Sequence, residues 1–194
     1  MRIWVSLLLV LSSTTLFAGD LEEAKLAWDR GNYQLAAEKY RAAAESGNPD
    51  AAAALGQFYE WGWGVEEDYG EALRWYQTAA DHGLVRAQTH LGQMLEKGLG
   101  VPQNYTEAHR MYRRAAEQGD MKAQQLLGLQ YSNGKGVPQN YVLAHMWFNL
   151  AAAQGDEWAR HLLQTIADDM SREQVAKAQD LASKCIDRDY KSCE

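Results

Sequence analysis

The stretch GLGVPQNYTEAHRMYRRAAEQGD, residues 98–120, returns 36 residues later as GKGVPQNYVLAHMWFNLAAAQGD, residues 134–156. The same spacing relates four tyrosines and four glycines, which are Tyr33, Tyr69, Tyr105, Tyr141, Gly47, Gly83, Gly119 and Gly155. A fixed period of this length is the signature of a repeat protein, in which each unit buries its apolar face only by stacking on its neighbours. The sequence therefore predicts a stack of similar units.

Each unit has the residue spacing of two short helices. Tyr69, Ala72 and Tyr76 fall at i, i+3 and i+7, which places them on one face of a first helix. A second helix follows after a few residues, and its inward positions are Ala87, Leu91 and Leu95. Each unit is therefore predicted to be a helix–loop–helix hairpin.

The ends of these helices carry capping residues. Asp68 precedes a first helix and is followed by Glu71, the pattern of a capping box, which Asn104 and Glu107 repeat one unit later. Gly83 and its equivalents are predicted to end the first helix as C-caps. The predicted N-caps of the second helices are Asn48, Asp120 and Asp156.

Glycine recurs at two kinds of position. Gly56, Gly92 and Gly128 stand inside the second helix, where glycine costs about 1 kcal/mol relative to alanine. A cost repeated three times predicts a close crossing of two helices, where a side chain would hold the backbones apart. The segments GWGV, GLGV and GKGV are predicted to be connecting loops, because glycine permits positive φ.

These features predict an all-α, right-handed α-solenoid of stacked helix–loop–helix repeats with a 36-residue period. The segments HLGQMLEKGLGVPQNYTEAHRMYRRAAEQG and LLGLQYSNGKGVPQNYVLAHMWFNLAAAQG resemble Sel-one-like repeats, the short relatives of tetratricopeptide repeats. The period, the Leu-Gly pair, the GxGV loop and the Ala-Ala-x-x-Gly end all agree with that family. Three repeats are expected, at 48–83, 84–119 and 120–155.

The remaining segments flank the three repeats. Residues 20–47 resemble a tetratricopeptide-like hairpin, and residues 156–194 are predicted to form a half-repeat, a capping helix and a tail. The capping helix is expected to begin at Ser171, with Gln174 three positions on. Residues 1–18 have a positive start, a short apolar run and a small-residue exit, which predicts a cleavable signal peptide. A retained membrane anchor is the alternative.

The two cysteines, Cys185 and Cys193, both lie near the C-terminal end. In an exported protein such a pair predicts a disulfide, which would hold the tail against the last helix. Two free thiols in a frayed end are the alternative. A periplasmic or secreted location is expected from the signal peptide.

No pattern of catalytic, metal-binding or cofactor-binding residues stands out. His109 and His145 share a repeat position that is apolar in other units, which favours packing over metal binding. The net charge of −7 opposes binding of nucleic acid. We therefore expect a protein that is not an enzyme and needs no cofactor or metal.

Three tryptophans break the repeat pattern and are candidates for partner contacts. Trp61 and Trp158 stand where other units have polar residues, which predicts exposure, and exposed tryptophan often anchors a partner. The alternative is that these rings, Trp63 above all, cover the ends of the solenoid or pack on loops.

Resemblance to tetratricopeptide repeats implies that the helix carrying Leu-Gly lines the concave face. The candidate partner-binding residues are then Gln57, Glu60, Trp61, Arg86, Gln93, Glu96, Lys97, Lys122 and Trp158. The same face is expected to carry Thr89, Gln125, Ser132 and Asn133.

The resemblance implies a scaffold or adaptor that binds a protein or peptide, in the cell envelope or at the host interface. A small-ligand binder or a weak β-lactam-interacting enzyme, like cysteine-rich secreted relatives, is the alternative. Those relatives carry a disulfide in each repeat, whereas the three repeats of this chain contain no cysteine. A purely structural spacer would leave the exposed tryptophans without a purpose.

Overall fold

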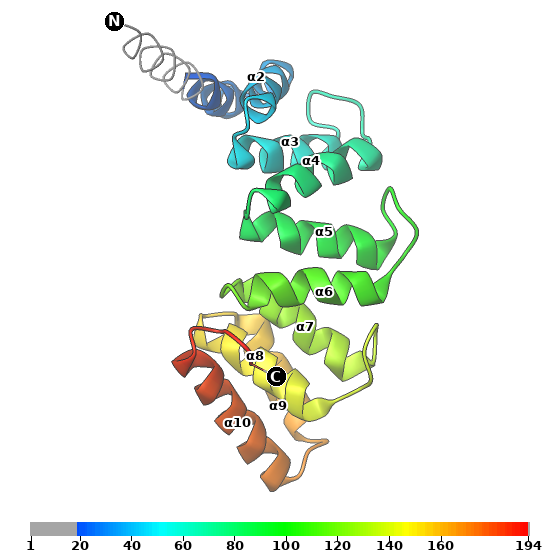
Figure 1. Cartoon of the computed structure of the whole chain (residues 1–194), viewed down its shortest axis with the longest axis vertical. Coiled ribbons are helices and arrows are strands. Elements are labelled where there is room, and N and C mark those ends of the chain that lie inside the picture. The colour runs from blue at the N-terminus through cyan, green and yellow to red at the C-terminus, as the bar shows by residue number, and fades with distance from the viewer. Residues whose placement is uncertain (1–18, 194) are drawn as a thin grey trace, which may run out of the picture. The chain divides into compact units, whose positions relative to one another are not determined.

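The computed structural model describes residues 19–193, and within that range it contains α-helices and no β-strand. The chain is an all-α solenoid built of helical hairpins, as the period predicts (Figure 1). The predicted signal peptide, residues 1–18, lies outside the described residues. No helix in residues 19–193 combines the length and the apolar character needed to cross a lipid bilayer.

The chain divides into two compact units, one ending at Ala87 and one beginning at Gln88. The first unit contains a helical stretch at residues 19–29 followed by α2 (Tyr33–Glu45), α3 (Pro49–Trp61) and α4 (Tyr69–Asp81). Helix α5 (Val85–Lys97) begins just before the division. The boundary therefore falls inside the second predicted repeat, residues 84–119.

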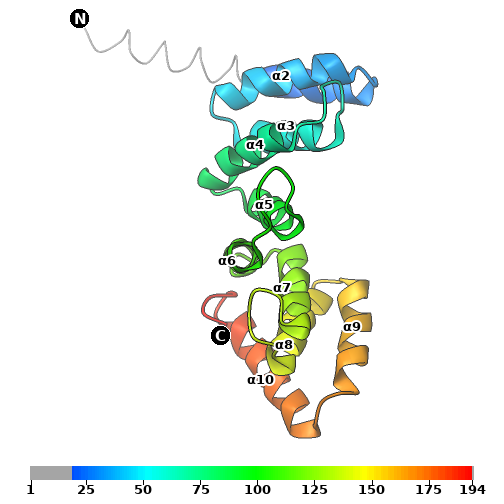
Figure 2. The same ribbon diagram turned by 90° about the vertical axis from the view of Figure 1, so that its right-hand side faces the viewer.

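The second unit continues with five helices, which are α6 (Tyr105–Ala116), α7 (Met121–Asn133), α8 (Tyr141–Ala153), α9 (Glu157–Ala167) and α10 (Arg172–Asp187). Within this unit α7 packs against α6 and α8, and α8 packs against α9. Helix α10 lies along α8, as the two views show (Figures 1 and 2). In the first unit α3 packs between α2 and α4.

The predicted helix caps are confirmed. A side-chain oxygen of the residue before the helix accepts a backbone N–H of the first turn at Asn48, Asp68, Asn104, Asp120 and Asp156, and the same bond forms at Asn140, which was not among the predicted caps. Such bonds satisfy N–H groups that the helix itself leaves without a partner. The glycine expected as a C-cap stands one residue later, as at Gly83 after His82.

The predicted capping boxes at Asp68 and Asn104 form only in half. The N–H of Asp68 donates instead to the carbonyl oxygen of Tyr59, at 2.9 Å, so no donor remains for Glu71. The Glu71 carboxylate pairs with Arg74, and an equivalent pair forms at the start of α6. A complete box forms at α10, where Ser171 and Gln174 bond reciprocally.

The glycines inside α3, α5 and α7 lie directly under aromatic rings of the next helix. A Cβ atom placed on Gly56 would lie 2.9 Å from the Tyr76 ring, and one on Gly92 would lie 2.5 Å from the Tyr112 ring. Gly128 lies still closer to Phe148. These contacts confirm the predicted close crossings, because no side chain larger than hydrogen fits between ring and backbone.

The second glycine of two GxGV loops is also held by a close approach. Gly64 has φ of +68° and lies against the backbone carbonyl group of Tyr33, at the start of α2. Gly136 has φ of +76°, and a Cβ atom there would lie 2.5 Å from the carbonyl oxygen of Tyr105. These two loops therefore rest on the start of α2 and on the start of α6, respectively.

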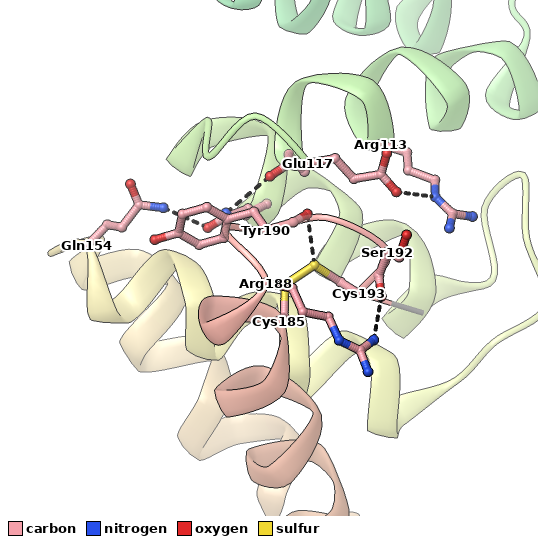
Figure 3. Close-up of a disulfide and its surroundings, with 10 residues drawn as sticks. Arg113, Glu117, Gln154, Cys185, Arg188, Tyr190, Ser192 and Cys193 are labelled. Carbon is pink, nitrogen blue, oxygen red and sulfur yellow. Dashed lines mark hydrogen bonds and ion pairs between the residues drawn. A yellow bond between two sulfur atoms is a disulfide. The ribbon is translucent and has the colours of Figure 1, made fainter.

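A disulfide closes the C-terminal end of the described chain. Cys185, in the last turn of α10, is joined to Cys193, and their Cα atoms are 4.7 Å apart (Figure 3). Arg188 donates a hydrogen bond of 3.2 Å to the carbonyl oxygen of Ser192, so the short tail folds back on itself.

Candidate partner-binding surface

Two of the three pattern-breaking tryptophans are open to solvent. Trp61 at the end of α3 is 61% exposed, and Trp158 at the start of α9 is 57% exposed. Their exposure confirms the prediction made from the polar residues at equivalent repeat positions. Trp63 is half-buried and contacts Trp28 and Phe58 in helices of the first unit, so for that ring the alternative of packing within the fold holds, although not on a loop.

In the first unit, Trp61 rests on an aromatic cluster. Its ring stacks on Trp63 with centroids 6.2 Å apart and an interplanar angle of 19°. Trp63 in turn contacts Trp28 at 4.8 Å and Phe58 at 5.9 Å. The cluster fixes the orientation of Trp61 and leaves its outer face accessible.

In the second unit, Trp158 borders a hollow of about 650 Å³. We call it the Trp158 hollow, and its lining residues are Met121, Lys122, Gln125, Leu129, Gly155, Asp156, Glu157 and Trp158. They come from the first turns of α7 and from the turn that leads into α9. Met121 is 38% exposed, so two large apolar side chains face solvent here.

The hollow contains one ammonium group and two carboxylates. The Asp156 carboxylate accepts the backbone N–H groups of Trp158 and Ala159, at 2.9 and 3.1 Å. The Glu157 carboxylate pairs with Arg160. Both carboxylates are therefore engaged within α9 itself.

Lys122 has a different environment. Its ammonium group donates to the side-chain oxygen of Gln125, at 2.6 Å. No carboxylate in residues 19–193 lies within ion-pair distance of it. Its positive charge therefore remains uncompensated beside the apolar side chains.

Two predicted partner-binding residues form hydrogen bonds at the helix crossings. Glu60 accepts a hydrogen bond of 2.6 Å from the Tyr76 hydroxyl, and Glu96 accepts one of 2.7 Å from the Tyr112 hydroxyl. Burial, together with the neighbouring carboxylate, raises the pKa of each tyrosine well above its ordinary value. The hydroxyls therefore stay protonated and keep donating.

The other predicted residues are distributed along α3, α5 and α7. Gln57 and Gln93 are half-buried, Lys97 is exposed, and Arg86 forms an exposed ion pair with Asp50 at 2.5 Å. Among the predicted partner-binding residues, the structure brings Lys122 and Trp158 into one hollow.

The expected outward orientation of Thr89 and Gln125 is wrong. Thr89 is 4% exposed, and its hydroxyl donates to Asp120, the N-cap of α7, at 3.0 Å. Gln125 is 3% exposed. This repeat position faces the neighbouring hairpin, which the tetratricopeptide resemblance did not reveal.

The sequence reasoning missed Met121 and Leu129. Leu129 stands at the repeat position that holds Gln57, Gln93 and Thr165 elsewhere. An apolar residue at an otherwise polar position is the same kind of signal that identified Trp158.

The histidines at the shared repeat position are packed inside the fold. His109 and His145 are 8% and 5% exposed, and Nδ1 of His109 lies 2.9 Å from the side-chain oxygen of Gln130. Burial lowers the pKa of His145. Across residues 19–193 no three His, Cys, Asp or Glu side chains gather as a metal site would require.

A family model described as Sel1 repeat matches residues 49–84, 85–120 and 122–156. The fold is similar to the crystal structure of a Sel1 repeat protein from Oxalobacter formigenes, with 28% identity and a TM-score of 0.72. That match covers 85% of this chain and 75% of the other.

A second similar structure is a protective antigen present in uropathogenic Escherichia coli strains, which displays an SLR (Sel1-like repeat) fold, with 33% identity and a TM-score of 0.77. The match covers 97% of this chain and 41% of that protein's length. Comparison with curated proteins found no match.

Proposed function

This chain belongs to the Sel1 repeat family, and from that premise we propose that it is an exported, non-catalytic adaptor that binds a partner protein in the cell envelope or at the host interface. Sel1 repeats support a role as a protein–protein interaction scaffold. Stacked helical hairpins present extended surfaces, and binding requires no reactive group.

The observation that carries the proposal is the Trp158 hollow. A tryptophan that is 57% exposed contributes nothing to the core, yet aromatic side chains dominate the binding energy of protein interfaces. Met121 and Leu129 extend the apolar surface around it. Trp61 is a second anchor of the same kind in the first unit.

Export is supported by the disulfide. Disulfides persist in oxidising compartments and are rare in the cytosol. Thiol counting on the unfolded, non-reduced mature protein should therefore find no free thiol at Cys185 or Cys193. Two reactive thiols in protein isolated from the envelope would contradict both the bond and the compartment.

The function is tested by cross-linked capture from native envelope extract. The wild type is compared with Trp61→Ala, Trp158→Ala and the double variant, and Ile186→Ala is the control. Ile186 is apolar and 48% exposed on α10, so its removal matches the loss of exposed apolar surface.

The proposal predicts one defined set of partners that the wild type and Ile186→Ala capture and the double variant loses. The single variants show which unit carries the larger share. If the double variant, with unchanged circular dichroism, captures the same proteins as the wild type, the proposed surface is wrong. If neither the wild type nor any of the variants captures a partner, the adaptor function itself is refuted.

A further inference from the structure

The proposed adaptor function does not specify which ligand the Trp158 hollow binds. The apolar side chains and the charge of the hollow indicate what kind of ligand fits. We propose that the hollow binds an acidic segment of a partner protein, with one large apolar side chain beside Trp158 and a carboxylate on Lys122. This inference rests on the proposed function and specifies its ligand.

The apolar part of the hollow favours binding of an apolar side chain of the partner. Met121, Leu129 and Trp158 border it together, and none of them is buried in the core of the unit. Exposed apolar surface rimmed by polar groups marks an interaction site. A bulky side chain inserted here would be surrounded by the Trp158 ring and two flexible aliphatic chains.

The positive charge of Lys122 in the hollow favours binding of a carboxylate of the partner. Asp156 is bonded to the N–H groups that open α9, and Glu157 is paired with Arg160. Lys122, by contrast, has only the neutral side chain of Gln125 as its partner. An incoming carboxylate would meet a positive charge that no group of the hollow neutralises, at the N-terminal end of α7, where the helix dipole also favours negative charge.

A comparison of repeat positions explains why Lys122 is uncompensated. Asp50, Arg86, Lys122 and Trp158 occupy the same position in successive repeats. In the first unit Arg86 forms an ion pair with Asp50, one period earlier. In the second unit the residue one period after Lys122 is Trp158, which cannot neutralise an ammonium group. The pair of opposite charges is replaced there by a cation and an aromatic ring.

An acidic protein segment fits this arrangement better than a nucleic acid, another polyanion. The chain carries a net charge of −7, which repels extended polyanions, whereas the hollow offers one local cation. One carboxylate near one apolar side chain satisfies both features.

The test uses the mature, disulfide-intact protein labelled with ¹⁵N and two pools of synthetic octapeptides with blocked ends. Each peptide contains one Leu or Phe. The acidic pool surrounds it with Asp and Glu, and the basic pool surrounds it with Lys and Arg. Binding is followed by the indole N–H signal of Trp158, which is assigned with Trp158→Ala.

The acidic pool should shift the Trp158 signal, and the basic pool should not. Lys122→Glu should weaken the binding of the acidic pool about tenfold or more and should create binding of the basic pool. Lys177→Glu, which makes the same charge change on an exposed site of α10, should leave both results unchanged. This reversal of preference is a result that general damage to the fold cannot produce.

Equal shifts with both pools, or no effect of Lys122→Glu, would overturn the inference. If neither pool shifts the signal while Trp158→Ala still loses the native partner, the acidic ligand is wrong and the adaptor function stands. If neither pool binds and Trp158→Ala captures every partner of the wild type, the inference fails together with the part of the proposed function assigned to Trp158.

Discussion

The crossing of α5 and α6 and the Trp158 hollow belong to the same unit, but they differ in the residues that form them. The crossing uses positions that repeat along the chain, and the hollow uses positions where the repeat is broken. Gly92 and Tyr112, which form the crossing, stand at positions that repeat at Gly56 and Tyr76. Leu129 and Trp158 stand where the repeat is broken. Repetition therefore marks the contacts that hold the hairpins together, and departures from it mark side chains that the stack does not need.

A third crossing, between α7 and α8, keeps the close contact of glycine and aromatic ring but lacks the hydrogen bond of the other two. At Gly128 the ring is Phe148, which has no hydroxyl, and the position of Glu60 and Glu96 is taken by Ser132. The hydroxyl and the carboxylate have disappeared together. The steric contact is kept in all three crossings, whereas the hydrogen bond depends on both partners being present.

The largest effect is expected from filling a crossing. Gly92→Leu would place a side chain where even a Cβ atom lies 2.5 Å from the Tyr112 ring. The helices must separate, and the free energy of unfolding should fall by about 3 kcal/mol. Urea denaturation followed by circular dichroism measures the change.

The control for this variant is Ala176→Leu, which adds the same side chain on the exposed face of α10. It should change the free energy of unfolding by less than about 0.5 kcal/mol. Equal effects of the two variants would show that Gly92 is not needed for close packing, and the contrast between crossing and hollow would lose its basis.

A smaller effect is expected from the hydrogen bond over the crossing. Tyr112→Phe removes the hydroxyl that donates to Glu96 and should cost about 1 kcal/mol. In a Glu96→Ser background, which copies the third crossing, the same change should cost almost nothing. A double-mutant cycle measures the coupling. Identical costs in both backgrounds would mean that the bond contributes nothing to stability.

The smallest effect concerns pH. Because burial lowers the pKa of His145, the folded chain keeps this imidazole neutral below the unfolded value near 6.5. The stability that depends on the neutral form is present above that value and is lost as the pH falls. His145→Leu, which uses the residue found at Leu73, should therefore lose less stability between pH 7 and pH 5 than the wild type. Parallel losses measured by thermal unfolding would show that His145 does not titrate on unfolding.

Most of the fold was predictable because the period, the capping residues and the glycines each indicate the same helical hairpins independently. The spacing of Tyr69, Ala72 and Tyr76 indicates which face of α4 is buried, and Asp68 indicates where that helix begins. Gly92 indicates a close crossing of two helices. The incomplete capping boxes were not predictable from local sequence. The N–H of Asp68 goes to the carbonyl oxygen of Tyr59 and that of Asn104 to the carbonyl oxygen of Leu95, and each acceptor lies in the preceding helix.

The candidate surface was predictable only in part. A break in the pattern identified Trp61 and Trp158 correctly as exposed. The roles of Glu60 and Glu96 were missed, although their absence together with a tyrosine hydroxyl in the third crossing was visible in the sequence. The hollow itself depends on where the start of α9 lies relative to α7, and the spacing of residues in the sequence does not specify that distance.

We propose above all that Trp158 contacts a partner while the repeated positions hold the hairpins together. The most direct test places the photocrosslinker p-benzoylphenylalanine at position 158 in the living cell, with position 176 on α10 as the matched exposed site. One defined cross-linked protein is expected from position 158 and none from position 176. Cross-linking at both sites alike, or at neither, with the protein folded and exported, would contradict it.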